Sequence, residues 1–170
     1  PAGLEGMRDR TVTVGAVTLE QRMIAWRVGW VIAPGGLVND VSRVHIYNGL
    51  VPSGFAQIGA RAALEVEDDG LAAANAEWQR RRDEVLRQLD GLPVVPPAGA
   101  WSLLLDVAAL GLDCARVSDA LLAQKIAATP MRGWGGEVAG RHVRFVFSNE
   151  PVERLHDLGP RVRAALDAAR

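Results

Sequence analysis

Two short apolar segments near the N-terminus constrain the fold more than any other feature. Residues 10–17 (RTVTVGAV) and 26–33 (WRVGWVIA) are rich in β-branched and aromatic side chains, and a Pro-Gly-Gly turn at 34–36 ends the second. Both segments predict buried β-strands. Two strands of this length do not make a stable sheet by themselves. We therefore expect them, with a helix predicted at 37–46, to complete a sheet that other residues supply.

The rest of the chain predicts an alternation of helices and strands. Apolar residues recur at helical spacing in 56–66, 71–89 and 117–126, and again from about residue 151, with an interruption expected at Gly159 and Pro160. Segments 101–107 and 142–147 predict strands, and 129–136 predicts a glycine-rich loop. The predicted fold class is α/β, with a compact α/β unit from about residue 75 onward.

Charge and composition exclude several classes of protein. The 19 Lys and Arg residues nearly balance 20 Asp and Glu residues, so no overall field attracts nucleic acid or anionic lipid. The most apolar stretch, residues 23–38, contains Arg27 and the turn at 34–36, so it predicts no membrane span. The single cysteine, Cys114, cannot form an internal disulfide, which favours a reducing, cytoplasmic compartment. The three histidines are scattered without metal-ligand spacing, so we expect no metal site.

A set of short sequence blocks, in a fixed order along essentially the whole chain, resembles one enzyme family. The blocks are GMRDRTV at 6–12, WRVGW at 26–30 followed by Ala33 and Pro34, RRD at 81–83, PAGAW at 97–101, Thr129 and Pro130, and VRF at 143–145. Together they resemble the C-terminal portion of class I/II aminotransferases, which are fold-type-I enzymes that depend on pyridoxal 5'-phosphate (PLP).

The resemblance implies a domain organisation and an activity. Residues 1–47 would form the end of the large cofactor-binding domain, 48–74 a helical connection, and 75–170 the small C-terminal α/β domain. The implied activity is PLP-dependent transfer of an amino group between an amino acid and a 2-oxo acid, by a cytoplasmic homodimer. The family's other cofactor contacts would lie upstream of this chain, so binding of PLP by this chain alone is not expected.

Three residues match binding positions of the family. Arg27 matches the arginine that pairs with the cofactor phosphate, Thr18 keeps a hydroxyl group near it, and Arg144 matches the arginine that binds the substrate α-carboxylate. A guanidinium suits both anions because it offers two parallel donors in one plane. Other roles remain open: Arg27 could pair with an interdomain carboxylate, and Arg144 could lie on a solvated strand face.

The sequence departs from the family at its reactive position. Eight residues before Arg27, where the family carries the lysine that forms a Schiff base with PLP, this chain has Leu19. A hydrocarbon side chain can neither attach the cofactor nor transfer a proton. The only lysine, Lys125, is expected to be a solvated helix residue. We therefore predict no catalytic residue in this chain and no activity by the chain alone.

Several functional alternatives remain. The chain could be a non-catalytic pseudoenzyme or interaction module that keeps the dimer surfaces of the fold. It could be half of a split enzyme completed by a chain that carries the N-terminal half. It could also be an unrelated α/β domain, in which case the two strands within residues 10–33 would pair only with each other.

Overall fold

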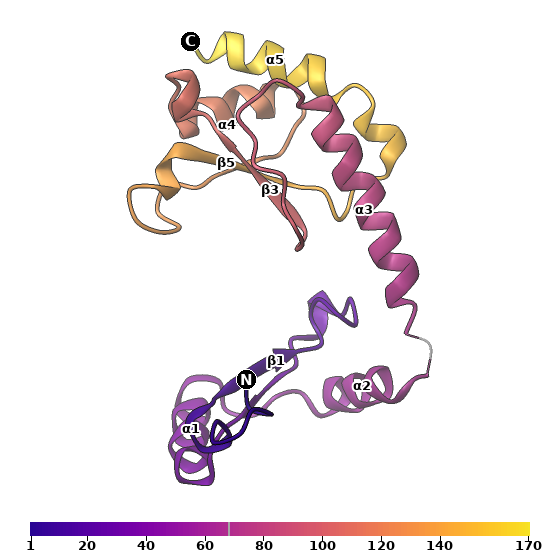
Figure 1. The fold of residues 1–170 in the computed structure, drawn as a ribbon, viewed down its shortest axis with the longest axis vertical. Helices are drawn as coiled ribbons and strands as arrows, with labels where there is room; N and C mark the ends of the chain where they lie inside the picture. The colour runs from indigo at the N-terminus through magenta and orange to yellow at the C-terminus, as the bar shows by residue number, and fades with distance from the viewer. Residues whose placement is uncertain (68) are drawn as a thin grey trace. The chain divides into compact units, whose positions relative to one another are not determined.

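The computed structural model describes residues 1–67 and 69–170, and the chain divides into two compact units, Pro1–Leu71 and Ala72–Arg170. Figure 1 shows their helices and strands. Each unit contains both element types, which confirms the predicted α/β class. The finer division at residues 47 and 74 stays a prediction.

The first unit is an antiparallel strand pair with two helices. Strand β1 (Thr13–Ala16) pairs with β2 (Gly29–Ile32), and helices α1 (Gly35–Gly49) and α2 (Gly54–Glu65) follow. Single 3-10 turns lie at Arg8–Arg10 and Ile24–Trp26. The two strands and two helices predicted from hydrophobic spacing are confirmed, with boundaries shifted by one to three residues. The prediction that both strands are buried is wrong for the described chain, because β1 and β2 form a two-stranded sheet and contain no buried residue.

Apolar side chains in the first unit are mostly exposed. Helix α1 buries none of its residues, and the exposed fractions reach 75% at Val14 and 90% at Tyr47. Within the described chain, β1 and β2 pair only with each other. So many exposed large apolar side chains in one small unit are typical of a surface that another polypeptide covers.

The second unit is a three-stranded antiparallel sheet with helices on one face. The strand order is β3 (Ser102–Asp106), β5 (His142–Val146), β4 (Thr129–Pro130). Helices α4 (Cys114–Ala123) and α5 (Leu158–Ala168) cover the sheet, and α3 (Leu71–Gln88) contributes the C-terminal part of its length to the same core (Figure 1).

Strand alternation separates a buried face of this sheet from an open one. Leu103 and Leu105 of β3 and Val143 and Phe145 of β5 are buried in one cluster with the helices. Successive side chains of a strand point to opposite faces. The central residue of β5, Arg144, therefore lies on the face that the helices leave open.

Two details differ from the sequence prediction. Residues 129–130 form the short edge strand β4 rather than a loop, because they pair with the middle of β5. Gly159 and Pro160 do not interrupt the last helix; they lie in the first turn of α5. Proline is tolerated there because the first N–H groups of a helix have no intrahelical acceptor. The chain before α5 is a separate 3-10 turn at Val152–Leu155.

Candidate functional site

An arginine held between two tryptophan rings is the most specific arrangement on the open face. The guanidinium carbon of Arg144 lies 5.2 Å from the ring centroid of Trp101 and 4.9 Å from that of Trp134. Trp101 directly precedes β3, and Trp134 belongs to the loop between β4 and β5. Both distances are within the range of favourable cation–π contacts. The two rings and the strand thus fix the position of the guanidinium.

The Arg144 guanidinium has no anionic partner among the described residues. Its Nε atom is buried and makes no hydrogen bond. Its strand neighbours, Thr129 and Leu104, are uncharged. A buried N–H without an acceptor is costly, so this donor favours an acceptor from outside the chain. Because the two tryptophan rings contact the guanidinium group, its N–H edge is left to bind a planar anion with two oxygen atoms, such as a carboxylate.

Ion pairs attach the Trp134 loop to its surroundings. Arg132, at the start of the loop, pairs with Asp113, the N-cap of α4. Arg141, at its end, pairs with Asp106 at 2.6 Å, which lowers the pKa of the Asp106 carboxyl group. The pKa of Asp113 is lowered too, chiefly by the backbone N–H of Arg116. These contacts restrict the loop and hence the ring of Trp134.

Arg27 and Thr18 line one cavity of the first unit. This cavity of about 630 Å³ lies between β1, β2 and α1, and Ser42 and His45 of α1 also face it. Arg27 has left-handed backbone geometry (φ 55°), and its Nη1 atom donates to the carbonyl of Ile24 at 3.1 Å. No carboxylate of the described residues pairs with it. The alternative role, pairing with a carboxylate, therefore has no partner within this unit.

Leu19 lies in the turn after β1, with 47% of its surface exposed, and is not among the residues that line the Thr18 and Arg27 cavity. Its backbone carbonyl accepts the N–H of Arg22 at 3.1 Å. The side chain offers no donor, acceptor or titratable group. The position therefore supplies no chemistry of its own.

The sequence prediction singled out the arginines but missed their neighbours. Trp101, Trp134 and His45 lie near these arginines in the structure, but no sequence pattern assigned them to a site. These residues are far apart along the chain, so no periodic pattern connects them.

The described residues contain no cluster of three metal-ligating side chains, and no helix among them is long and apolar enough to cross a membrane.

Comparison with known proteins identifies the family. The model of the family "Aminotransferase class I and II" matches residues 5–157. The chain belongs to this family. An aspartate aminotransferase of Pyrococcus abyssi is 31% identical over 97% of this chain. The arginine–pyruvate transaminase of Pseudomonas aeruginosa is 32% identical over 89% of it.

Solved aminotransferase structures have the same fold. The aromatic aminotransferase from Pyrococcus horikoshii superposes with a TM-score of 0.86, at 30% identity, over 98% of this chain. The chain covers 46% of that structure and 43% of the Pyrococcus abyssi enzyme, so it spans less than half the length of its relatives. It corresponds to a C-terminal part of the aminotransferase fold. Although β1 and β2 pair only with each other in the described chain, membership of the family decides against an unrelated domain.

Proposed function

We propose that this chain is an aminotransferase C-terminal region that binds the substrate carboxylate through Arg144 and the PLP phosphate through Arg27 and Thr18. We further propose that it does not transfer amino groups by itself, because Leu19 occupies the position of the reactive lysine. The observation that carries this proposal is the unpaired Arg144 guanidinium between two indole rings.

The surroundings of Arg144 support carboxylate binding over a structural role. A structural arginine normally pairs with a carboxylate or a carbonyl, as Arg81 of helix α3 does with Glu77 and Ser148. Arg144 has neither kind of partner among the described residues. Holding a substrate carboxylate there would orient the amino acid for reaction, and such orientation is a large part of catalysis.

The Arg27 cavity fits the phosphate of PLP but not its covalent attachment. An exposed guanidinium and a hydroxyl group lining one cavity are suitable donors for phosphate oxygens. When bound, PLP supplies an electron-accepting ring that stabilises negative charge on the substrate carbon. This chain's own share of the chemistry is binding and orientation. Attachment of the cofactor and movement of the proton need an amine that Leu19 lacks.

The exposed apolar side chains of the first unit support the proposal that a partner chain binds there. Its strand pair and α1 leave Val14, Val44 and Tyr47 largely exposed, and the chain spans less than half the length of its relatives. We propose that a chain carrying the N-terminal half covers this surface, or that a homodimer does. The same observation favours a second function, a non-catalytic pseudoenzyme that acts as an interaction module. The buried thiol of Cys114 is compatible with a cytoplasmic location.

Mixing the chain with PLP tests the catalytic proposal. We expect no visible absorption from amine-bound cofactor with the native sequence. Lys125→Arg removes the only lysine and is the control for non-specific attachment. In the Lys125→Arg background, Leu19→Lys should produce the absorption once a chain with the N-terminal half is added. Transamination by the native chain alone would refute the proposal that it lacks the reactive amine.

A further inference from the structure

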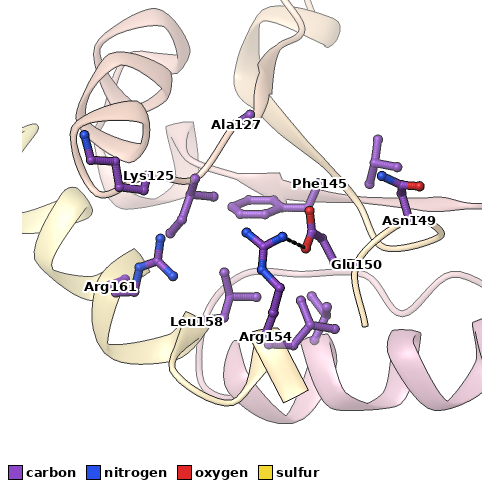
Figure 2. A pocket seen from close by; sticks show the side chains of 12 residues that line it. Lys125, Ala127, Phe145, Asn149, Glu150, Arg154, Leu158 and Arg161 are labelled. Carbon is purple, nitrogen blue, oxygen red and sulfur yellow. Dashed lines mark ion pairs between the residues drawn. The ribbon is translucent and has the colours of Figure 1, made fainter. Parts of the chain in front are cut away.

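A second cavity, of about 320 Å³, lies in the unit Ala72–Arg170. It is formed by the end of α4, strand β5 and the segment that leads into α5, and Figure 2 shows the side chains around it. Phe145 lines this cavity, whereas the neighbouring Arg144 belongs to the open face of the sheet. Adjacent strand residues point to opposite faces. Of the strand residues that line the cavity, Phe145 therefore lies on the opposite face from Arg144, and Val146 lies at the end of β5; Arg144 itself does not line the cavity.

The floor of the cavity is apolar. Ile126, Phe145 and Leu158 contribute to it, and all three are buried. In Figure 2 the ring of Phe145 lies across the centre of the cavity, with Arg154 and Leu158 below it. A cavity of this volume, with an apolar floor and a few polar groups at its edge, has the properties of a small-molecule site.

The rim of the cavity is cationic. Lys125, Arg154 and Arg161 line it, with Glu150 as the only acidic residue among the described residues that do so. Glu150 pairs with Arg154 at 3.1 Å. Arg161 donates to the carbonyl of Gln124 at 3.0 Å and pairs with Asp157 at 3.2 Å. The ammonium group of Lys125 has no partner among the described residues, so one positive charge at the rim is uncompensated.

The backbone geometry of Lys125 is unusual for a residue other than glycine. Helix α4 ends in a pair of hydrogen bonds, from the N–H of Ile126 to Leu121 and from the N–H of Lys125 to Leu122, both at 2.9 Å. This arrangement places Lys125 in left-handed geometry (φ 63°), where glycine is usual. The chain uses arginine at all its other basic positions. Its only lysine thus occupies a strained position at the cavity rim.

We propose that this cavity is a binding site for a small organic carboxylate with an apolar body, such as an aromatic monocarboxylate. The apolar body would pack on Phe145 and Ile126. The Lys125 side chain, which is directed away from Phe145 in Figure 2, would turn toward the cavity so that its ammonium group pairs with the carboxylate. Because neither Arg144 nor Arg27 is among the lining residues, and Phe145 lines the cavity from the helix-covered face, this site is additional to the proposed Arg144 and Arg27 sites and does not depend on them.

Titration of the full chain with benzoate, followed by backbone amide NMR, tests the proposal. We expect saturable shifts at the amides of Lys125, Ile126 and Phe145, and none with benzamide, which has the same shape without the charge. Lys125→Gly should weaken benzoate binding about tenfold, because it removes a charge-assisted contact. Lys125→Arg should retain binding because it keeps the positive charge.

The variants distinguish binding in this cavity from misfolding and from binding at Arg144. Lys125→Gly should also raise the unfolding midpoint, because glycine relieves the left-handed geometry, so weaker binding cannot be attributed to misfolding. Arg144→Met should leave binding at the cavity unchanged. The proposal would be overturned if benzoate shifted only the amide signals of Trp101 and Trp134, or if benzamide bound as tightly as benzoate. It would also be overturned if Lys125→Gly bound benzoate with the affinity of the native chain. A response to inorganic phosphate but not to benzoate would also overturn it.

Discussion

The guanidinium of Arg144 and the ring of Trp134 are 4.9 Å apart, although Trp134 is 63% exposed on a loop. Loop residues with large exposed rings normally sample several positions. Here the loop ends are attached by the Arg132–Asp113 and Arg141–Asp106 ion pairs. The exposed tryptophan is thereby held over a charge that has no other partner in the described chain.

Replacing this ring should weaken carboxylate binding at Arg144. In Trp134→Ala we expect a loss of about 0.5–2 kcal/mol in the binding free energy of acetate, the range of a cation–π contact. The Nε–H signal of Arg144, followed by NMR during an acetate titration, measures it. Trp26→Ala, in the other unit, is the matched control and should leave the titration unchanged. Equal affinity in both variants would show that Trp134 does not position Arg144.

Glu84 should make the stability of the second unit depend on pH in the acid range. The Arg87 guanidinium and then the Gln88 amide donate to its carboxylate, which lowers its pKa from 4.5 to about 2. The folded state therefore favours the charged form. This stabilisation is complete above pH 4.5 and is lost as the pH falls through 2. The unfolding midpoint, measured between about pH 2 and 6, should fall less steeply in Glu84→Gln; parallel curves would contradict this assignment.

Two consecutive leucines of α4 should respond very differently to truncation. Leu121 is fully buried in the core of the second unit, whereas Leu122 is 62% exposed. Leu121→Ala should cost about 2–5 kcal/mol of unfolding free energy, because it removes buried surface and leaves a cavity. Leu122→Ala should change it by less than about 0.5 kcal/mol. Chemical denaturation measures both, and similar losses would mean that the helix face is assigned incorrectly.

Gly159 should not tolerate a larger side chain. A Cβ atom there would lie 2.6 Å from the backbone oxygen of Gln88 and 2.9 Å from its side-chain oxygen. Gly159→Ala should therefore cost about 1–3 kcal/mol of unfolding free energy, the usual cost of overpacking. Gly140→Ala is the control, since its Cβ would meet no atom of the described residues within 4 Å. Thermal unfolding compares them, and equal midpoints would contradict the close approach of α5 to Gln88.

Local patterns predicted most elements, whereas the surroundings of the site depend on tertiary structure. The helical spacing around Val117 and Leu121 and the alternation in 142–147 gave the correct element types, since burial of one face imposes these periods. Strand β4 is only two residues long, and it forms because its backbone pairs with that of β5. No local sequence pattern predicts such a pairing. The contact between Arg144 and Trp134 depends on how the loop between β4 and β5 folds, and local sequence patterns do not predict that fold.

The phosphate proposal makes a prediction that distinguishes Arg27 from arginines that already pair with a carboxylate. Arg27→Ala should weaken PLP binding about tenfold, because one charge-assisted pair to phosphate is lost. Pyridoxal, which lacks the phosphate, should bind the native chain and the variant equally weakly. Arg61→Ala is the matched control, because Arg61 pairs with Glu65 on α2 at 2.7 Å. Fluorescence titration of the complex with a chain carrying the N-terminal half measures the affinities. If Arg61→Ala and Arg27→Ala weakened PLP binding alike, the effect would be one of general charge, and Arg27 would not be the phosphate ligand.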